Sequence, residues 1–281
     1  MVRSTDPTHS ERAAATFALA LEPDTASTLA KISEKASRFL ARNVRTKRLT
    51  MRNLRPLVTF TFDDVAASAC SAGATILERH GIHGTYYVSG GGCGAASPCG
   101  RLATAGEVKA IWAKGHELGC HTYSHTAVAR LSGPELELDI ERNRSFLADI
   151  GGDGATRNFA YPYGDMRFRA KRRLEGRFRS CRSVIPGINA GAADLGALRA
   201  WPLEDAAIDR ATIGELIAAN VRAKGWLIFY SHDVREQPSR FGVSPGLLEF
   251  SVAAAKSAGC RVVTIAAGLR AAMGGSENEP A

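Results

Sequence analysis

Two neighbouring aspartates follow an apolar run early in the chain. The run is LVTFTF, residues 57–62, and Asp63 and Asp64 come directly after it. Adjacent carboxylates at the end of a buried strand repel each other unless a cation lies close to both. A surface turn explains such a pair equally well, because aspartate is common in turns. The pair alone therefore does not decide between a chemical site and a surface turn.

Two histidines lie four residues apart in the segment GHELGCHTYSH, residues 115–125. On a helical turn, or on a strand end that curls into a turn, the imidazoles of His121 and His125 can reach one ion. A lone histidine is more often structural, but this spacing favours a metal site. One aspartate and two histidines with open positions form a ligand set of the facial-triad type. Such a site suits hydrolysis, because a bound ion lowers the pKa of water and polarises a carbonyl.

A third histidine follows the apolar run WLIFYS, residues 226–231. Barrel enzymes place acids and bases at the carboxyl ends of their strands, which is the position predicted for His232. The alternative is a histidine at the edge of the core that is bonded to a carbonyl.

The elements that must position these residues alternate between apolar runs and helical stretches. Alternation at this spacing predicts parallel βα units, hence an α/β barrel or a doubly wound sheet. No dinucleotide or phosphate-loop motif is present, which favours the barrel. The predicted strands are residues 57–62, 85–88, 117–122, 158–161, 180–185, 198–203, 226–231 and 261–265.

Helix starts are predicted from local capping patterns. Thr104 with Glu107, and Thr212 with Glu215, have the spacing of a capping box. The other predicted helices begin near Ser132, near Met166 and at Ser244–Pro245.

These motifs together resemble the polysaccharide deacetylase family (NodB homology, carbohydrate esterase family 4). The resemblance rests on Thr61–Asp64, on His121–His125, on GHELG before it and on the strand-end His232. The segment FAYPYG, residues 159–164, corresponds to the family's Arg-x-Pro-x-Gly loop. The resemblance covers roughly residues 57–269 and implies a distorted (β/α)7 TIM-like barrel with a basic helical N-terminal extension.

The resemblance also implies a role for each site residue. Asp64, His121 and His125 would bind a divalent metal, expected to be Zn²⁺, and Asp63 would be the general base. The Tyr163 backbone N–H would stabilise the oxyanion. His232 would protonate the departing amine. The implied reaction removes N-acetyl groups from an aminosugar polymer or a glycan intermediate.

The chain departs from the family pattern in two places. Ala160 stands where the family has an arginine that pairs with the base, and we expect Arg182 to replace it, ahead of Arg157 and Arg199. The family's acidic partner of the acid histidine has no clear match either. The acidic residues that remain open for this role are Asp194, Glu204, Asp205 and Asp209.

The N-terminal segment is strongly basic. Residues 1–56 hold 11 Lys and Arg against five Asp and Glu, whereas the whole chain has a net charge of +8. Basic residues fall on one face of a predicted helix, from Lys31 to Arg45, beside an apolar stripe that runs from Leu29 to Val44. Most charge runs are solvated faces, so we expect the stripe to pack on the body. The alternative is peripheral contact with a membrane or an acidic polymer; nucleic acid is not expected, because no reading motif accompanies the charge.

Composition and length exclude several classes of protein. The chain has 281 residues, 45% of them hydrophobic and 23% charged, which excludes wholesale disorder, collagen and coiled coil. Its six scattered cysteines do not form a disulfide scaffold or a zinc knuckle. The apolar run 13–21 is interpreted as a helix rather than a secretory signal, and a cytoplasmic location is expected. The expected organisation is an extension over 1–55, a catalytic domain over 56–273 and a flexible tail over 274–281.

The leading hypothesis is therefore a metal-dependent glycan N-deacetylase. An O-acetyl polysaccharide esterase uses the same site chemistry and stays open. A catalytically weakened carbohydrate-binding homologue is the third reading, motivated by Ala160.

Overall fold

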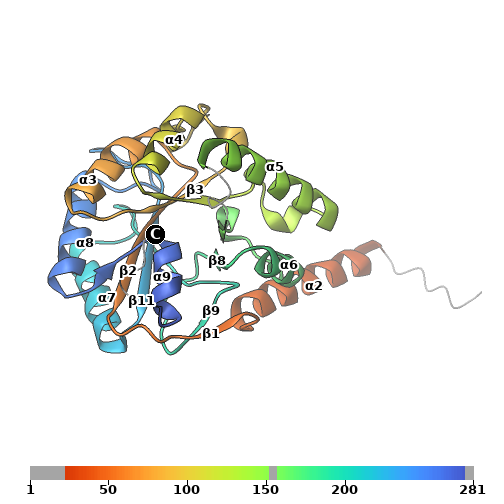
Figure 1. Ribbon diagram of the computed structural model, residues 1–281. Coiled ribbons are helices and arrows are strands. Elements are labelled where there is room, and N and C mark those ends of the chain that lie inside the picture. Colours follow the sequence, from red (N-terminus) through yellow and green to blue (C-terminus); the bar gives the residue numbers. More distant parts are fainter. Residues whose placement is uncertain (1–22, 152–156, 276–281) are drawn as a thin grey trace, which may run out of the picture.

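A curled parallel sheet forms the centre of the molecule (Figure 1). The computed structural model describes residues 23–151 and 157–275. In spatial order the strands are β10 (Trp201–Pro202), β11 (Trp226–Ser231), β2 (Leu57–Asp63), β3 (Thr85–Val88), β6 (Glu117–Cys120), β7 (Asn158–Ala160) and β8 (Ser180–Arg182), with β12 (Arg261–Val262) beside β2. The predicted distorted α/β barrel is confirmed.

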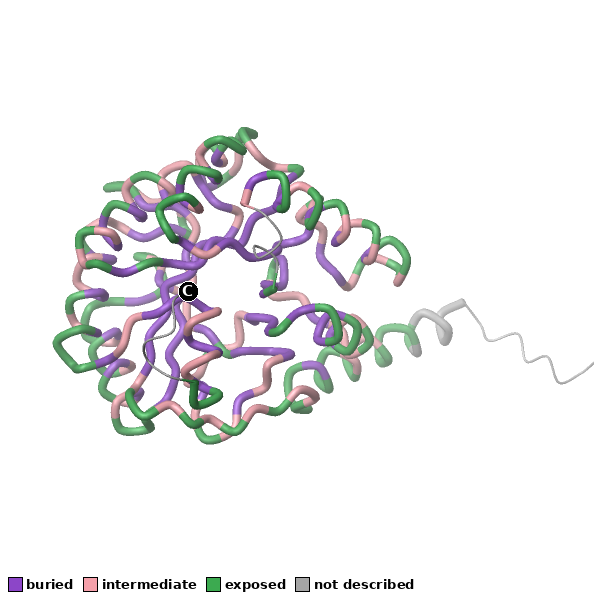
Figure 2. Tube along the Cα trace, in the orientation of Figure 1, coloured by how far each residue is buried: buried purple, intermediate pink, exposed green. Residues whose placement is uncertain are grey.

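Helices cover the outside of the sheet, as the green outer ring and purple strands of Figure 2 show. They are α3 (Ala74–Arg79), α4 (Ala105–Ala113), α5 (Gly133–Gly151), α6 (Phe168–Arg177), α7 (Arg210–Ala223) and α8 (Pro245–Ser257). A π-helix, Ala69–Gly73, precedes α3. Short 3-10 turns lie at Gly90–Gly92, Val128–Arg130 and Pro162–Gly164.

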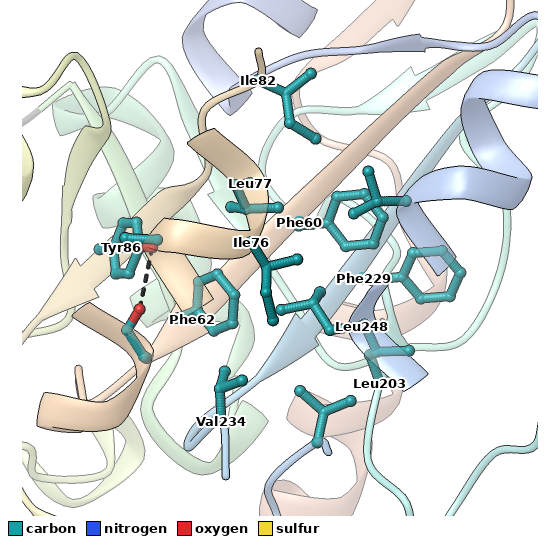
Figure 3. Packing of buried hydrophobic residues seen from close by; sticks show 14 of the residues in the cluster. Phe60, Phe62, Ile76, Leu77, Ile82, Tyr86, Leu203, Phe229, Val234 and Leu248 are labelled. Atoms are coloured by element: carbon teal, nitrogen blue, oxygen red, sulfur yellow. Dashed lines mark hydrogen bonds between the residues drawn. The ribbon is translucent and has the colours of Figure 1, made fainter. Parts of the chain in front are cut away.

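Alternation along β2 separates the helix-facing core from the barrel interior. Phe60 and Phe62 lie with Leu77 and Leu248 in the core between sheet and helices (Figure 3). The Phe60 ring stacks on Phe229 with centroids 5.7 Å apart. Because side chains of a strand alternate between faces, the odd-numbered residues of β2 point to the other side, into the barrel. Asp63 therefore ends β2 on the interior face.

Helix α9 (Ile265–Ala272) closes the end of the barrel opposite Asp63. Gly268 of α9 packs against the Trp226 ring, and a Cβ at position 268 would lie 2.5 Å from it. Trp226 in turn donates from Nε1 to Thr59 Oγ1 at 2.9 Å inside the barrel. Since Trp226 begins β11, α9 covers the amino ends of the strands and leaves their carboxyl ends free for chemistry.

Capping was predicted correctly at two helices and wrongly at one. Thr104 and Glu107 form the expected capping box of α4, and Ser244 caps α8. The start of α7, by contrast, is capped by Asp209, whose side chain accepts from Thr212 N–H at 2.8 Å. Thr212 is therefore inside the helix, and the Asp209 carboxylate, three residues earlier, accepts from its amide. The last strand is also shorter than predicted, since the chain enters α9 at Ile265.

The N-terminal helix α2 (Pro23–Asn43) contacts the body through polar groups. Glu34 pairs with Arg167 at 2.9 Å, and Ser37 Oγ accepts from Phe168 N–H at 3.0 Å. Ala41 is the fully buried residue of this face. The expectation that the apolar stripe packs on the body is wrong, because Ile32 and Phe39 are 56% and 65% exposed.

Two antiparallel strand pairs complete the structure. β1 (Arg48–Thr50) pairs with β9 (Ala192–Asp194), so part of the N-terminal segment is attached to the barrel domain. β4 (Ala96–Ser97) pairs with β5 (Gly100–Arg101) in the loop after β3. The domain boundary near residue 55 stays a prediction. No helix within the described residues is both long enough and apolar enough to span a membrane.

Candidate metal-dependent active site

The first part of the site is the end of β2, where Asp63 and Asp64 point in different directions. Asp63 is buried and lies on the interior face of the strand. Asp64 and the following Val65 have left-handed φ angles of 57° and 59°, which are uncommon for residues other than glycine. This turn brings the Asp64 carboxylate round to the histidines that follow β6.

The two histidines reach the same point from the end of β6. His121 is buried and donates from Nδ1 to the Ala160 carbonyl at 2.9 Å, which leaves the lone pair of Nε2 facing Asp64. Thr122 and His125 have left-handed φ angles of 62° and 52°. These conformations place the His125 ring 5.1 Å from that of His121.

Three ligand atoms converge, one each from Asp64, His121 and His125. His125 Nε2 lies 2.8 Å and His121 Nε2 3.4 Å from Asp64 Oδ1, and all three atoms lie within 4.8 Å of one another. Oδ1 is buried and accepts no hydrogen bond among the described residues. A buried carboxylate oxygen without a hydrogen bond is costly unless a cation binds it. The donor set and this unpaired oxygen fit a divalent metal ion.

The electrostatic surroundings of His121 and Asp64 favour the protonation states that bind a metal. Burial lowers the pKa of His121 to about 4, although Asp63 and Asp64 oppose this, so the imidazole is neutral near pH 7. Burial alone would raise the pKa of Asp64, but His125 and His121 beside it hold that pKa well below its usual range. A neutral imidazole and an ionised carboxylate are the forms that bind a metal.

Arg182 lies beside Asp63, at the end of β8. Its Nη2 donates to both carboxylate oxygens of Asp63, at 2.6 Å to Oδ1. The guanidinium is fully buried and lies over the rings of Tyr87 and Tyr230, at 5.3 Å and 5.0 Å from their centroids. A cation between aromatic faces is stabilised by their quadrupoles, which offsets part of its desolvation.

The two weaker arginine candidates lie elsewhere. Arg199 is exposed and donates to the Pro186 carbonyl at 2.9 Å, and Arg157 is exposed where β7 begins. Only Arg182, of these three, contacts Asp63. Arg182 lies at a different position in the chain from the family arginine, which corresponds to Ala160. However, β8 is the neighbour of β7, and Arg182 is paired in register with Ala160. The two positions therefore lie side by side at the same edge of the sheet.

His232 follows β11 and is held by backbone rather than by a carboxylate. Its Nδ1 lies 3.2 Å from the Phe241 carbonyl, which fixes Nδ1 as the donor and leaves Nε2 for other contacts. The Phe241 ring lies 5.5 Å from the imidazole. The loop that carries Phe241 is closed by the buried Asp233, which accepts from Ser239 N–H at 3.0 Å and from Arg235 Nε at 2.7 Å.

Three of the four open acidic candidates have other partners. Asp194 accepts from the buried Lys171 at 2.6 Å, on the side of the barrel that faces α2. Asp205 accepts from Ser244 N–H at 2.7 Å, and Asp209 caps α7. None of these three carboxylates is aimed at His232.

Glu204 is the remaining candidate, and it is part of the site's electrostatic environment. It follows β10, and Pro202 of β10 is in register with Tyr230 of β11, so Glu204 and His232 follow neighbouring parallel strand ends. Burial raises the pKa of Glu204 and Asp63 raises it further, while His232 lowers it. The sequence interpretation left Glu204 among four candidates, and only the strand order separates it from the others.

Tyr163 lies at the solvent side of the site. It stands in the Pro162–Gly164 turn with a φ of 58°; the residue is 71% exposed, and its ring lies 4.6 Å from the His125 ring. Among the described residues, five of the six non-glycine positive φ angles belong to Asp64, Val65, Thr122, His125 and Tyr163. Such conformations concentrate at functional sites, where surrounding structure compensates for their cost.

Tyr87 and Tyr230, whose rings flank Arg182, were not predicted from the sequence as site residues. Both lie near the carboxyl ends of strands adjacent to β2, and this position is the only sequence signal that they carry. It was not sufficient, because neither side chain is of a type that indicates catalysis by itself. The Phe241 carbonyl was also missed, since a backbone acceptor leaves no signature in a sequence.

Known proteins resemble part of this chain. Residues 51–175 match the model of the family described as Polysaccharide deacetylase. This segment belongs to the polysaccharide deacetylase family. The resemblance predicted from the motifs is thereby confirmed.

Individual relatives are distant. A chitin deacetylase from Arthroderma benhamiae is 28% identical over 93 residues, which is 33% of this chain and 24% of the relative. The chain thus spans about a quarter of the length of the curated deacetylases that it matches.

Solved structures share the fold of the deacetylase-family domain. The Bc1960 peptidoglycan N-acetylglucosamine deacetylase superposes with a TM-score of 0.55 and 20% identity, over 82% of this chain and 94% of that one. A family 4 acetyl xylan esterase from Clostridium thermocellum, solved with a cobalt ion, gives 0.53 and 20%, over 76% and 90%. Both comparisons support the barrel fold.

Proposed function

We propose that this protein is a metal-dependent hydrolase that removes N-acetyl groups from N-acetylglucosamine-type residues of a polysaccharide or glycan intermediate. The observation that carries the proposal is the convergence of Asp64, His121 and His125 beside an Asp63 that is already paired with Arg182. Several relatives are named as deacetylases of chitin or peptidoglycan, which supports this substrate class.

A divalent ion held by Asp64, His121 and His125 would lower the pKa of water and polarise the acetamide carbonyl. We propose Zn²⁺, because two imidazoles and one carboxylate with open positions are typical of catalytic zinc. Both histidines offer Nε2 toward the carboxylate, which is the side-chain arrangement that such an ion requires.

Asp63 would act as the general base. The Arg182 guanidinium donates to the Asp63 carboxylate and orients it, and this carboxylate would accept a proton from the attacking water. Oxygen of that water forms a bond to the acetamide carbon, and the Tyr163 backbone N–H would stabilise the negative charge that develops on the carbonyl oxygen.

His232 would act as the general acid. With Nδ1 donating to the Phe241 carbonyl, a protonated His232 presents Nε2–H to the amide nitrogen. The C–N bond then breaks, the amine leaves with this proton, and acetate is released. Glu204, at the neighbouring strand end, would support the protonated imidazole by its charge.

Two alternatives follow from the same residues. O-acetyl ester hydrolysis needs no protonated amine, so an esterase would depend much less on His232. A weakened carbohydrate-binding homologue is disfavoured, because the acid, the base and all three ligand positions are occupied by competent side chains. Exopolysaccharide as the polymer and the cytoplasm as the location stay predictions.

The decisive experiment measures acetate release from chitooligosaccharides and from acetylated xylan, with and without chelator. Asp63→Asn is compared with Asp149→Asn, which alters an exposed carboxylate on α5. We expect release from chitooligosaccharides to fall by about 10³-fold in Asp63→Asn only. Release from acetylated xylan alone would favour the esterase. Metal binding without release from either substrate would favour the binding protein.

A further inference from the structure

Helix α2 carries its apolar residues on the side that faces away from the body. Ile32 and Phe39 lie about half a turn around the helix from Ala41, which is fully buried against the body. Figure 2 shows most of the described part of α2 as exposed. Leu40 and Val44, on the neighbouring edge, are 40% and 39% exposed. We call these four residues the outer apolar stripe.

Basic side chains border the outer apolar stripe on one edge. Lys31, Lys35 and Arg42 are exposed and have no ion-pair partner among the described residues. Of the α2 side chains that the structure describes, Glu34 is the single carboxylate, and it points to the body, where it pairs with Arg167. Among the side chains that the structure describes, the free face of α2 is therefore apolar and cationic.

The orientation of α2 is fixed by its contacts with α6. Glu34 contacts Arg167 just before α6 begins. Lys171, one turn further along α6, donates to the Ala41 carbonyl at 2.9 Å. The helices thus run side by side in the same direction, and the part of α2 before Glu34 continues past the start of α6 (Figure 1). Because α6 begins shortly after the Pro162–Gly164 turn of the site, α2 extends at the catalytic end of the barrel.

We propose that the outer apolar stripe and its basic edge bind the surface of an anionic lipid bilayer. A helix in the plane of a membrane inserts apolar side chains between lipids while lysine and arginine contact anionic headgroups. An acidic glycan would pair with the basic edge but would leave Ile32 and Phe39 in water. This proposal goes beyond the hydrolase activity and does not depend on it.

Co-sedimentation of the full chain with vesicles tests the proposal. The vesicles are phosphatidylcholine alone, or phosphatidylcholine with about one third phosphatidylglycerol. We expect at least about tenfold stronger binding to the anionic vesicles, weakened at high salt. Phe39→Ser should abolish most of this binding, whereas Leu138→Ser, which alters a 73% exposed leucine on α5, should not.

A second pair of variants tests the basic edge. Lys35→Gln with Arg42→Gln should lower binding to anionic vesicles several-fold, whereas Lys109→Gln with Arg222→Gln, exposed on α4 and α7, should leave it unchanged. Acetate release from soluble chitooligosaccharides and the melting temperature should not change in any of these variants, which separates this proposal from the proposed function.

Three outcomes would overturn the membrane proposal. The first is equal sedimentation with both kinds of vesicle, and the second is wild-type binding by Phe39→Ser. The third is a dimer in solution that Phe39→Ser converts to a monomer, with no vesicle binding by the wild type. That result would assign the outer apolar stripe to a second copy of this chain.

Discussion

At the scale of single residues, the site depends on groups whose charges are balanced by buried partners. Asp63 and Arg182 form a buried ion pair, and His121 is kept neutral by burial. Removing one member of such a set leaves the other uncompensated, which is why single substitutions here should have large effects.

Arg182→Gln should lower acetate release by about 100-fold or more, because Asp63 loses the cation that orients it. The same variant should lose about 3–5 kcal/mol in free energy of unfolding, since a buried carboxylate is left unpaired. Arg199→Gln, at an exposed site away from Asp63, is the control. Near-normal turnover by Arg182→Gln would remove Arg182 from the site.

In the metal-free protein, the pH dependence of the free energy of unfolding should include a contribution from His121. Its pKa in the folded state is about 4, below the roughly 6.5 of an unfolded histidine, so the unfolded chain binds more protons between these values. Stability should therefore be full above about pH 6.5 and fall as the pH decreases toward 4, by about 3 kcal/mol.

His121→Gln should lose this part of the pH dependence. Urea titrations of both proteins at several pH values measure it, and the quantity of interest is their difference, because other groups titrate in both. Parallel curves for the two proteins would contradict the assignment.

At the scale of elements, Lys171 of α6 holds the N-terminal segment on the barrel. Its buried ammonium donates to the carbonyls of Ala41 and Val44 at 2.9 Å and 2.7 Å, and to Asp194 at 2.6 Å. One cation therefore caps the carboxyl end of α2 and neutralises a residue of β9.

Lys171→Met should release α2 and β1 while the site is retained. We expect faster hydrogen exchange over residues 30–50 and a change of less than about twofold in acetate release from a soluble substrate. Lys109→Met, at an exposed position on α4, serves as the control. Unchanged exchange over residues 30–50 would show that other contacts hold α2.

At the scale of the whole molecule, we expect the barrel to fold without the metal. Its apolar core lies between strands and helices, and α9 closes the end of the barrel opposite the site. The ion would therefore be required for catalysis and would add stability only by binding the native state.

Chelation should abolish acetate release and leave the far-ultraviolet circular dichroism spectrum unchanged. Adding a divalent metal at about 100 times its Kd should restore activity and raise the free energy of unfolding by about 2.7 kcal/mol. Asp64→Asn should show neither effect. Metal-induced stabilisation that persists in Asp64→Asn would place the ion elsewhere.

The sequence alone determined the βα alternation, the motifs and the resemblance to the family. Strand and helix periods and capping patterns are local, so Leu57–Asp63, Thr85–Val88 and the α4 cap could be predicted directly. The candidate site residues could be selected because they lie at or after the ends of apolar strands, and parallel strands bring their carboxyl ends to one edge. They are Asp63, Asp64, His121, His125 and His232.

Tertiary structure decided the contacts between residues far apart in the chain. Arg182 is 119 residues from Asp63, and the strand order brings it beside that carboxylate while Arg157 and Arg199 lie elsewhere. Strand order also separates Glu204 from the other acidic candidates. Packing likewise decides the orientation of α2: its apolar stripe faces outward because polar groups on its other face bind α6. Local pattern fixes which side chains share a face, but only packing determines which face meets the body.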